Sequence, residues 1–465
     1  MKKNHLLLLF LVAVYSGYAQ QKFKITYEQL KEYEGIYEYV NKGTLKIAAS
    51  PKDTVLYAII NESKYKLNAI DKDIFENMSK EKVTFNRTAG AITGYSSEGS
   101  TFRLQSKKVV FPKEMWYARL NPKDFKYVYQ QPKQDPDGIP TGNLDKTGLD
   151  KALLSEMMQK IVDGTLPNVH SVLIIKDGKL VFEEYFYEYN KTKLHELRSA
   201  TKSFVSALTG IAIDKGFIKS KDETVLSFFP DYTFKNLTED KRLISIKNLL
   251  TNQSGLDCDV SNPRSEGNET TMNNSADWIQ FTLDLPMIDV PGGKGMYCSG
   301  NPITLGRIIE KATKIPLPDF ARQTLFKDIG IKNFIWNFKP DASSSETFCQ
   351  VYLSPRDMGK FGLLYLNKGM WNGKQVISKD WVQESLTRQS VVQGVNYGYL
   401  WWLKYLDING VRYNGKAAQG NGGQKIYIWE EQNMVTIITG GNYNSQSPSD
   451  EINQKYILAA FNKKQ

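Results

Sequence analysis

The sequence predicts an α+β protein in two parts: a small all-β meander or barrel, followed by a larger domain in which helices cover an antiparallel sheet and form a lobe beside it. Three observations carry this prediction. The chain has 465 residues, which is too long for one ordinary hydrophobic core. Short alternating apolar runs fill residues 22–130, and helical periodicities appear only later. Hydrophobic residues make up 41% of the chain and charged residues 24%, as in globular proteins.

Residues 1–19 are expected to be a secretory signal peptide. Lys2 and Lys3 give a short basic start, residues 6–14 form an apolar run, and small residues end at Ala19. This run is too short to hold a chain in a bilayer as an anchor. We therefore expect a periplasmic or secreted protein with no membrane anchor after cleavage.

Residues 22–130 are expected to form the small all-β domain. Polar or glycine-bearing turns separate the short alternating runs, a spacing typical of a meander or barrel. No catalytic constellation is found in this part. The predicted strands cover residues 44–48, 54–60, 65–70, 83–85, 91–95 and 101–104.

Residues 131–146 contain three prolines and two glycines and are expected to be a linker. The second domain, residues 147–465, should open with a helix at 149–161 and a hairpin whose turn is Asp177-Gly178. Because strands are expected at both ends of this domain, they predict one antiparallel sheet with helices between them. The other expected elements are helices at 203–215, 303–312 and 450–461 and strands at 424–429 and 434–440.

Charge and histidine content exclude several function classes. The net charge is +10, but the basic residues are scattered, so no nucleic-acid partner is expected. His5 leaves with the signal peptide, and His170 precedes an apolar strand, where a structural role is expected. His195 lies too close in sequence to Ser199 for an ordinary Ser-His-Asp triad. Serine chemistry would therefore need a lysine or tyrosine base, and neither a metal nor a cofactor is expected.

Ser199-x-x-Lys202 is the central chemical motif. An apolar helical pattern follows it directly, so Ser199 should lie at a helix N-terminus with Lys202 one turn later on the same face. The helix dipole would stabilise negative charge at the serine. Burial beside that dipole would disfavour the ammonium form of Lys202 and let it act as a base. The alternative is a helix-capping serine beside a solvated lysine.

Tyr297-Cys298-Ser299 forms a second element, on a loop that follows a glycine-rich stretch and precedes a helix. A tyrosine near cations can relay a proton to a leaving group. A tyrosine that serves only in packing is the alternative.

Gly420-Asn421-Gly422-Gly423-Gln424 forms the third element and opens a strand. Glycines at a strand edge let a substrate approach the backbone. The N–H of Gln424 could then pair with that of Ser199 as an oxyanion hole. The alternative is a plain glycine-rich turn.

In this order and spacing the three elements resemble the motif set of class C β-lactamases and the wider penicillin-recognising serine hydrolases. Their relatives include D-amino-acid-specific peptidases, esterases of the same fold and amide-oligomer hydrolases. The resemblance covers the second domain, while residues 22–130 resemble the small lipocalin-like domains often attached to these hydrolases. Further matching segments are 249–256, 353–358, 397–402 and 439–442.

The resemblance implies a β-lactamase/transpeptidase-like fold and a role for each matched residue. Ser199 would form the acyl-enzyme, Lys202 would activate it and Tyr297 would shuttle protons. The N–H groups of Ser199 and Gln424 would form the oxyanion hole. Substrate contacts would come from Ser299, Asn421, Gly422 and Gly423.

Two positions depart from the family pattern. Ser299 stands where the family often has asparagine, and Asn421 stands where it often has lysine or histidine. A missing cation at 421 would weaken binding of a substrate carboxylate. The departures favour esters or amides without that anchor over β-lactams or peptidoglycan stem termini. A non-catalytic cell-wall or peptide binder, a true β-lactamase and a DD-peptidase remain alternatives.

In related folds, the segments that hold Cys258 and Cys298 both border the catalytic cleft. An exported protein can keep a disulfide, and a bridge between these two residues would fix the loop that presents Tyr297. Cys349 would then be unpaired. Two buried reduced thiols at 258 and 298 are the alternative.

Overall fold

The computed structural model describes residues 23–39, 43–60, 63–343 and 349–461. The expected signal peptide therefore lies outside the described residues. The chain divides into two compact units, the first within residues 23–109 and the second mainly from Val110 onward. Within the described ranges, no helix is both long and apolar enough to cross a bilayer.

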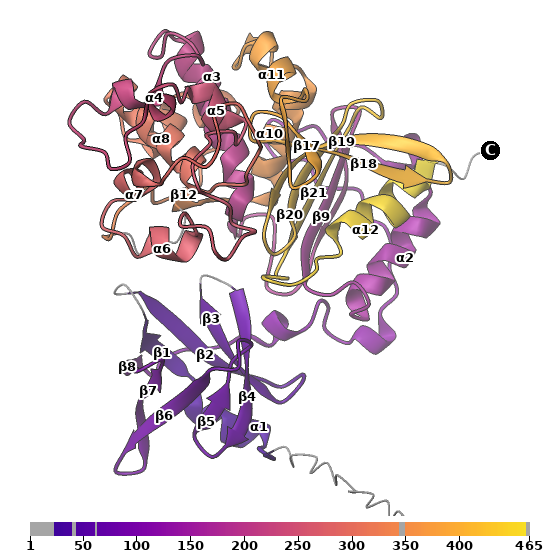
Figure 1. Cartoon of the computed structure of the whole chain (residues 1–465). Helices are drawn as coiled ribbons and strands as arrows, with labels where there is room; N and C mark the ends of the chain where they lie inside the picture. Colours follow the sequence, from indigo (N-terminus) through magenta and orange to yellow (C-terminus); the bar gives the residue numbers. More distant parts are fainter. Residues whose placement is uncertain (1–22, 40–42, 61–62, 344–348, 462–465) are drawn as a thin grey trace, which may run out of the picture. The chain divides into compact units, whose positions relative to one another are not determined.

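The first unit is a closed barrel, as expected (Figure 1). It begins with the short helix α1 (Tyr27–Leu30), whose Thr26 accepts a hydrogen bond from the N–H of Gln29 in a capping box. Aromatic side chains fill the interior: the ring of Tyr33 lies 5.0 Å from that of Phe75, which lies 5.5 Å from that of Phe85. The barrel strands are β1 (Gly35–Glu38), β2 (Thr44–Ser50), β3 (Val55–Ile60), β4 (Ser63–Asp71), β5 (Ile74–Glu76), β6 (Lys82–Thr88), β7 (Ala91–Ser97) and β8 (Ser100–Ser106).

The first unit ends at Val109, whereas the sequence analysis placed the end of the β domain at residue 130. No strand forms in the described residues between 107 and 168. Tyr127 and Tyr129 pack against the hydrophobic core of the second unit, which is why residues 110–130 group with that unit.

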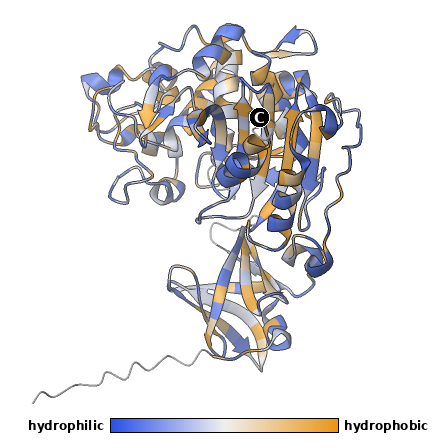
Figure 2. Ribbon diagram, turned by 90° about the vertical axis from the view of Figure 1, so that its right-hand side faces the viewer, coloured by the Kyte–Doolittle hydropathy of each residue, from blue (hydrophilic) through white to orange (hydrophobic). Residues whose placement is uncertain are grey.

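The second unit is built on an antiparallel sheet with strand order β10-β9-β21-β20-β19-β18-β17-β16. The expected hairpin supplies β9 and β10, and the C-terminal strand β21 pairs with β9, so both ends of the domain meet in one sheet. Every residue of β20 and β21 is buried, and Figure 2 shows hydrophobic residues along the central strands. The strands are β9 (Val169–Lys176), β10 (Lys179–Tyr185), β16 (Ser390–Val392), β17 (Val395–Tyr397), β18 (Trp402–Ile408), β19 (Val411–Gly420), β20 (Gln424–Trp429) and β21 (Met434–Gly440).

Helices cover both faces of this sheet. On one face, α10 (Pro355–Leu366) packs so closely that a Cβ added at Gly362 would lie 2.5 Å from the side chain of Val435. On the other face, α2 (Lys151–Val162) packs with the C-terminal helical segment, in which α12 (Ser449–Glu451) continues as irregular helix to Phe461. Asn453 of this segment accepts a hydrogen bond from Thr436 of β21 at 2.7 Å.

The remaining helices form the lobe beside the sheet (Figure 1). Its central helix α3 (Thr201–Asp214) is almost wholly buried and packs on α8 (Gly300–Thr313). The other helices are α4 (Glu239–Arg242), α5 (Ile246–Leu250), α6 (Glu269–Asn273), α7 (Trp278–Asp284), α9 (Leu317–Ala321) and α11 (Lys379–Ser385). Short strand pairings join β11 (His195–Glu196) and β12 (Ile335–Trp336) to β13 (Val351–Leu353), and β14 (Met370–Trp371) to β15 (Lys374–Gln375).

Candidate active site

Ser199 lies in a single 3₁₀ turn, Arg198–Ala200, that leads directly into α3. The preceding Arg198 has a φ of 50°, in the left-handed region that side chains with a Cβ rarely adopt. Glu196 forms an ion pair with Arg198 at 3.0 Å, and the Arg198 guanidinium lies 4.9 Å from the centre of the Tyr443 ring. These contacts hold the strained residue that presents Ser199.

Lys202 reaches back one turn to the serine. Its Nζ donates a hydrogen bond to Oγ of Ser199 at 2.8 Å, and the residue is only 8% exposed. No carboxylate among the described residues lies within ion-pair distance of Lys202, so its ammonium has no acidic partner there.

The ring of Tyr297 lies beside Lys202. The lysine Nζ is 5.0 Å from the ring centre, and on another side the ring packs on Trp402 at 5.3 Å. An aromatic face at this distance stabilises an ammonium. Ser199, Lys202 and Tyr297 are therefore brought together from two distant parts of the sequence.

Asn252 orders the loop that carries Tyr297. Its backbone carbonyl accepts a hydrogen bond from the N–H of Met296 at 2.8 Å. Its side-chain oxygen accepts from Nδ2 of Asn301 at 3.0 Å and from the N–H of Cys298 at 3.4 Å. One buried residue, through its backbone carbonyl and its side chain, thus holds the residues on both sides of Tyr297.

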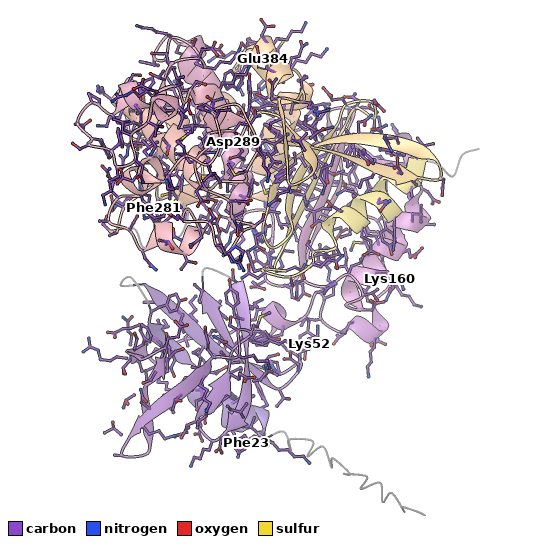
Figure 3. The ribbon with its side chains drawn as sticks, viewed as in Figure 1. Phe23, Lys52, Lys160, Phe281, Asp289 and Glu384 are labelled. Atoms are coloured by element: carbon purple, nitrogen blue, oxygen red, sulfur yellow. A yellow bond between two sulfur atoms is a disulfide. The ribbon has the colours of Figure 1, made fainter. Side chains whose placement is uncertain are left out.

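Two further contacts fix the same loop. Cys258 and Cys298 form a disulfide, and Cys349 is a buried free thiol. The carboxylate of Asp289, labelled in Figure 3, accepts a hydrogen bond from the N–H of Lys294 at 2.7 Å. Backbone N–H groups, that of Lys294 first, hold the pKa of Asp289 below its ordinary value, as expected for a carboxylate that closes a turn.

The end of β19 packs directly against the turn that holds Ser199. A Cβ added at Gly420 would lie 2.2 Å from the carbonyl oxygen of Leu197 and 3.1 Å from the backbone nitrogen of Ser199. Gly420 pairs with Gln424, so the strand that starts at Gln424 begins at this edge. The third sequence element is therefore placed beside the first.

The glycines at 422 and 423 serve packing inside the turn. Gly422 has a φ of 91° and Gly423 a φ of 101°, and a Cβ at Gly423 would lie 2.2 Å from Oγ of Ser447. Asn421 is exposed, and its side chain exchanges hydrogen bonds with Asn444. The side chain of Gln424 is fully buried and donates to the carbonyl of Gly440 at 2.8 Å, which ties the turn to β21.

A cavity of about 20 Å³, large enough for one water molecule, adjoins α3. Burial raises the pKa of the Cys349 thiol in its wall to about 12, which keeps that thiol protonated and makes it a poor nucleophile. The cavity is lined by Arg198, Thr201, Lys202, Val205, Ser299, Pro302, Ile303, Phe338, Cys349 and Gln350.

Sequence reasoning missed Glu269. The Ser299 hydroxyl, in the cavity wall, donates a hydrogen bond to Oε1 of Glu269 on α6. Glu269 belongs to none of the three motifs and lies 30 residues before Ser299, so no local pattern could have found it.

The two histidines that remain after His5 pair with each other in the core. Nδ1 of His170 lies 2.8 Å from Nε2 of His195, and both side chains are buried against Tyr189. Burial lowers the pKa of His195 to about 4, so this ring is neutral at physiological pH. Neither histidine lines the cavity beside Lys202.

Comparison with known proteins gives three informative similarities. A protein of Salmonella heidelberg (strain SL476) named "Putative D-alanyl-D-alanine carboxypeptidase" is 24% identical over 222 residues, or 43% of this chain and 51% of that protein. The chain thus spans about half the length of the curated relatives it matches. The solved structure "Putative 6-aminohexanoate-dimer hydrolase from Bacillus anthracis" is 20% identical, with a TM-score of 0.55 over 76% of this chain and 94% of that one. "EstCE1, a hydrolase with promiscuous acyltransferase activity" is 14% identical, with a TM-score of 0.55 over 69% and 100%.

Because the two solved structures are only 20% and 14% identical to this chain, they establish its fold and nothing more. A family profile described as Beta-lactamase matches residues 154–459, which is well over half of the chain. This match begins in α2 and ends in the C-terminal helical segment, so it takes in the whole sheet and the helical lobe. The chain belongs to the Beta-lactamase family of serine hydrolases.

Proposed function

We propose that this protein is an exported hydrolase that cleaves small esters, amides or peptides through an acyl-enzyme on Ser199. The observation that carries the proposal is the 2.8 Å hydrogen bond between Ser199 and the buried Lys202, which has no carboxylate within ion-pair distance among the described residues. Lysine and serine in this geometry match the requirement for a nucleophile and its base. Within the described residues, the two histidines are hydrogen-bonded to each other and leave no competing imidazole base.

The neutral amine of Lys202 takes the hydroxyl proton as Oγ of Ser199 attacks the substrate carbonyl. The ammonium that results lies beside the face of Tyr297, which stabilises it. The Tyr297 hydroxyl then passes a proton to the leaving oxygen or nitrogen, and water releases the acyl group in a second, similar step. Tyr397 lies next to Tyr297, and burial raises the pKa of Tyr397 well above its ordinary value, so it stays a neutral phenol.

The backbone N–H groups of Ser199 and Gln424 form the oxyanion hole in this proposal. Support comes from the contact between Gly420 and the Ser199 turn, since Gly420 pairs with Gln424 across the end of the sheet. Two such donors typically contribute several kcal/mol to stabilising the tetrahedral intermediate.

The substrate is proposed to lack a carboxylate anchor. Asn421 supplies no charge, and the guanidinium of Arg198 in the cavity wall is already balanced by Glu196. One relative is named as a putative carboxypeptidase, and one solved structure of the same fold as a hydrolase with promiscuous acyltransferase activity; these names support amide and ester cleavage as candidates. We place this activity in the second unit, with the barrel as an accessory domain and export directed by residues 1–19.

Labelling by a fluorophosphonate tests the proposal. The full-length protein should be labelled at Ser199, as mapped by peptide mass spectrometry, and Ser199→Ala should not be labelled. Ser206→Ala removes another buried serine of the same helix and should be labelled at the rate of the unmodified protein. A folded protein that reacts with neither fluorophosphonate nor penicillin would instead be a ligand-binding member of the family.

A hydrolysis screen then separates the substrate classes. It compares short-chain p-nitrophenyl esters, D-amino-acid amides and a chromogenic cephalosporin. Turnover of esters or amides at rates far above that of the cephalosporin is expected, because position 421 lacks a cation. Preferred turnover of the cephalosporin would contradict this assignment.

A further inference from the structure

Lys425 is a buried charged residue next to the start of β20. The residue is only 8% exposed, and lysines are seldom buried to this extent unless their charge is paired. Burial lowers the pKa of Lys425 to about 8, although the charge of Asp450 opposes this fall, so the amine is mostly an ammonium at neutral pH. No step of the proposed acyl transfer uses this buried charge.

The ammonium of Lys425 bridges two elements at the end of the sheet. Its Nζ donates a hydrogen bond to Oε1 of Gln419 at 2.7 Å and forms an ion pair with Oδ1 of Asp450 at 3.1 Å. Gln419 lies directly opposite Lys425 on β19, and Asp450 belongs to α12. The same carboxylate also accepts hydrogen bonds from Lys404 of β18 and Tyr427 of β20. Of these three donors, Lys425 is the one whose side chain also bonds to Gln419 in the part of the chain that the structure describes.

Gln419 directly precedes the residue that packs against the nucleophile. A Cβ added at the next residue, Gly420, would lie 3.1 Å from the backbone nitrogen of Ser199. Glycine restricts its own backbone less than any other residue, and Gly422 and Gly423 follow in the same turn, so this end of β19 depends on contacts from outside. A hydrogen bond from an ammonium to the side chain of the preceding residue is a strong contact of this kind.

We propose that Lys425 is a positioning residue that, through Gln419, holds the end of β19 against the turn of Ser199. This inference rests on the proposed acyl-enzyme at Ser199 and adds to it a residue that touches neither substrate nor reacting atoms. Asp450 anchors the ammonium from α12. Without the bridge the end of β19 can shift relative to Ser199, and a displacement of about half an ångström costs about tenfold in turnover.

Two substitutions break the bridge from its two ends. Lys425→Met keeps most of the length of the side chain and removes the ammonium, and Gln419→Leu removes the acceptor at a less buried position. Each should lower kcat on p-nitrophenyl acetate, and the rate at which folded protein is labelled by fluorophosphonate, by about tenfold with KM nearly unchanged. The double variant should be no slower than either single variant, because all three lack the same bond.

Lys404→Met is the matched control. Lys404 binds the same carboxylate of Asp450, at 2.5 Å, but its side chain does not hold Gln419 in the described structure. This variant should have a lowered free energy of unfolding in urea and an unchanged kcat. Gln419→Glu keeps an oxygen acceptor for the ammonium and should retain most of the labelling rate, a rescue that a role in packing alone would not predict.

Labelling at Ser199 separates the two levels of the argument. If folded Lys425→Met and Gln419→Leu are labelled at the rate of the unmodified protein, the positioning role is wrong and the acyl-enzyme stands. An equal loss of kcat in Lys404→Met would also overturn it, because the effect would then come from Asp450 alone. If Lys425→Met does not fold, Gln419→Leu and Gln419→Glu decide the question by themselves. If the folded, unmodified protein is not labelled, the proposed function itself fails.

Discussion

Gly420→Ala should separate the position of the nucleophile from its chemistry, because the substitution changes no reacting group. The new methyl would lie 2.2 Å from the carbonyl oxygen of Leu197 and 3.1 Å from the nitrogen of Ser199. Both atoms belong to the backbone, so no side chain can rotate away. To reach a tolerable contact of about 3 Å, the turn with Ser199 and the end of β19 must separate by roughly 0.8 Å, a shift of the size that overpacking produces.

The expected cost has two parts. Overpacking at one buried position typically destabilises a protein by about 1–3 kcal/mol. Displacement of a nucleophile by about 1 Å can lower turnover by about 10²-fold even when the fold survives. The rate of fluorophosphonate labelling and kcat on a p-nitrophenyl ester should therefore fall by about 10²-fold in protein that is still folded.

Gly415→Ala is the matched control. It lies on the same strand, and its new methyl would lie 2.6 Å from the side chain of Trp429, away from Ser199. Both variants should show a lowered free energy of unfolding in urea, but only Gly420→Ala should lose labelling. Equal labelling rates in the two variants would refute the idea that the end of β19 positions the nucleophile.

Three further outcomes are expected. Lys202→Ala should slow acylation by about 10²–10⁴-fold. Since the two residues act as a unit, the double variant with Ser199→Ala should be no slower than Ser199→Ala alone. Near-normal burst kinetics in Lys202→Ala would contradict this expectation. Replacing Cys258 and Cys298 by serine opens a loop with a sequence separation of 40 and should lower the free energy of unfolding, measured in urea, by about 3–4 kcal/mol. The value of kcat should also fall, because the loop that carries Tyr297 is released. The pKa of His195 is lowered by burial to about 4, so the unfolded chain binds more protons than the folded one between about pH 4 and pH 6.5, and stability should fall as pH drops through that window. His195→Gln should reduce this loss in the free energy of unfolding by up to about 3 kcal/mol. A pH profile of stability that His195→Gln leaves unchanged would argue against a role for His195 in it.

The positions of the sheet strands and long helices can be predicted from local sequence because nearly every residue in these elements is buried. The strands expected at 424–429 and 434–440 are β20 and β21, and the hairpin at Asp177-Gly178 is β9 and β10. Both turn residues have positive φ, as that dipeptide predicts. The barrel strands β1 and β5 were missed because runs of four and three residues are too short to show alternation.

The Ser199–Lys202 contact could be predicted because it depends on helix geometry alone, with donor and acceptor residues three positions apart. That Gly422 and Gly423 let a substrate approach stays a prediction. The structure adds a packing constraint that the sequence did not indicate, since a Cβ at either residue would contact the segment 443–449 of the protein itself. The close approach occurs at Gly420, and its partner is the turn of Ser199. Glycine marks a tight contact in a sequence but does not say with what.

The sequence predicts a lysine or tyrosine base because neither His170 nor His195 suits a triad, and the structure offers a physical reason to set both histidines aside. His170 and His195 are buried as a hydrogen-bonded pair, so neither imidazole can reach a substrate without breaking that bond and exposing the core around Tyr189. Lys202, by contrast, holds its single strong contact to Ser199 and meets an aromatic face where an ammonium would form. Two conditions favour a lysine that acts as a base. Before proton transfer its neutral amine is favoured by a site without water or carboxylates, and after proton transfer its ammonium must be stabilised. The burial of Lys202 without a carboxylate within ion-pair distance among the described residues fits the first condition, and the ring of Tyr297, 5.0 Å from Nζ, fits the second.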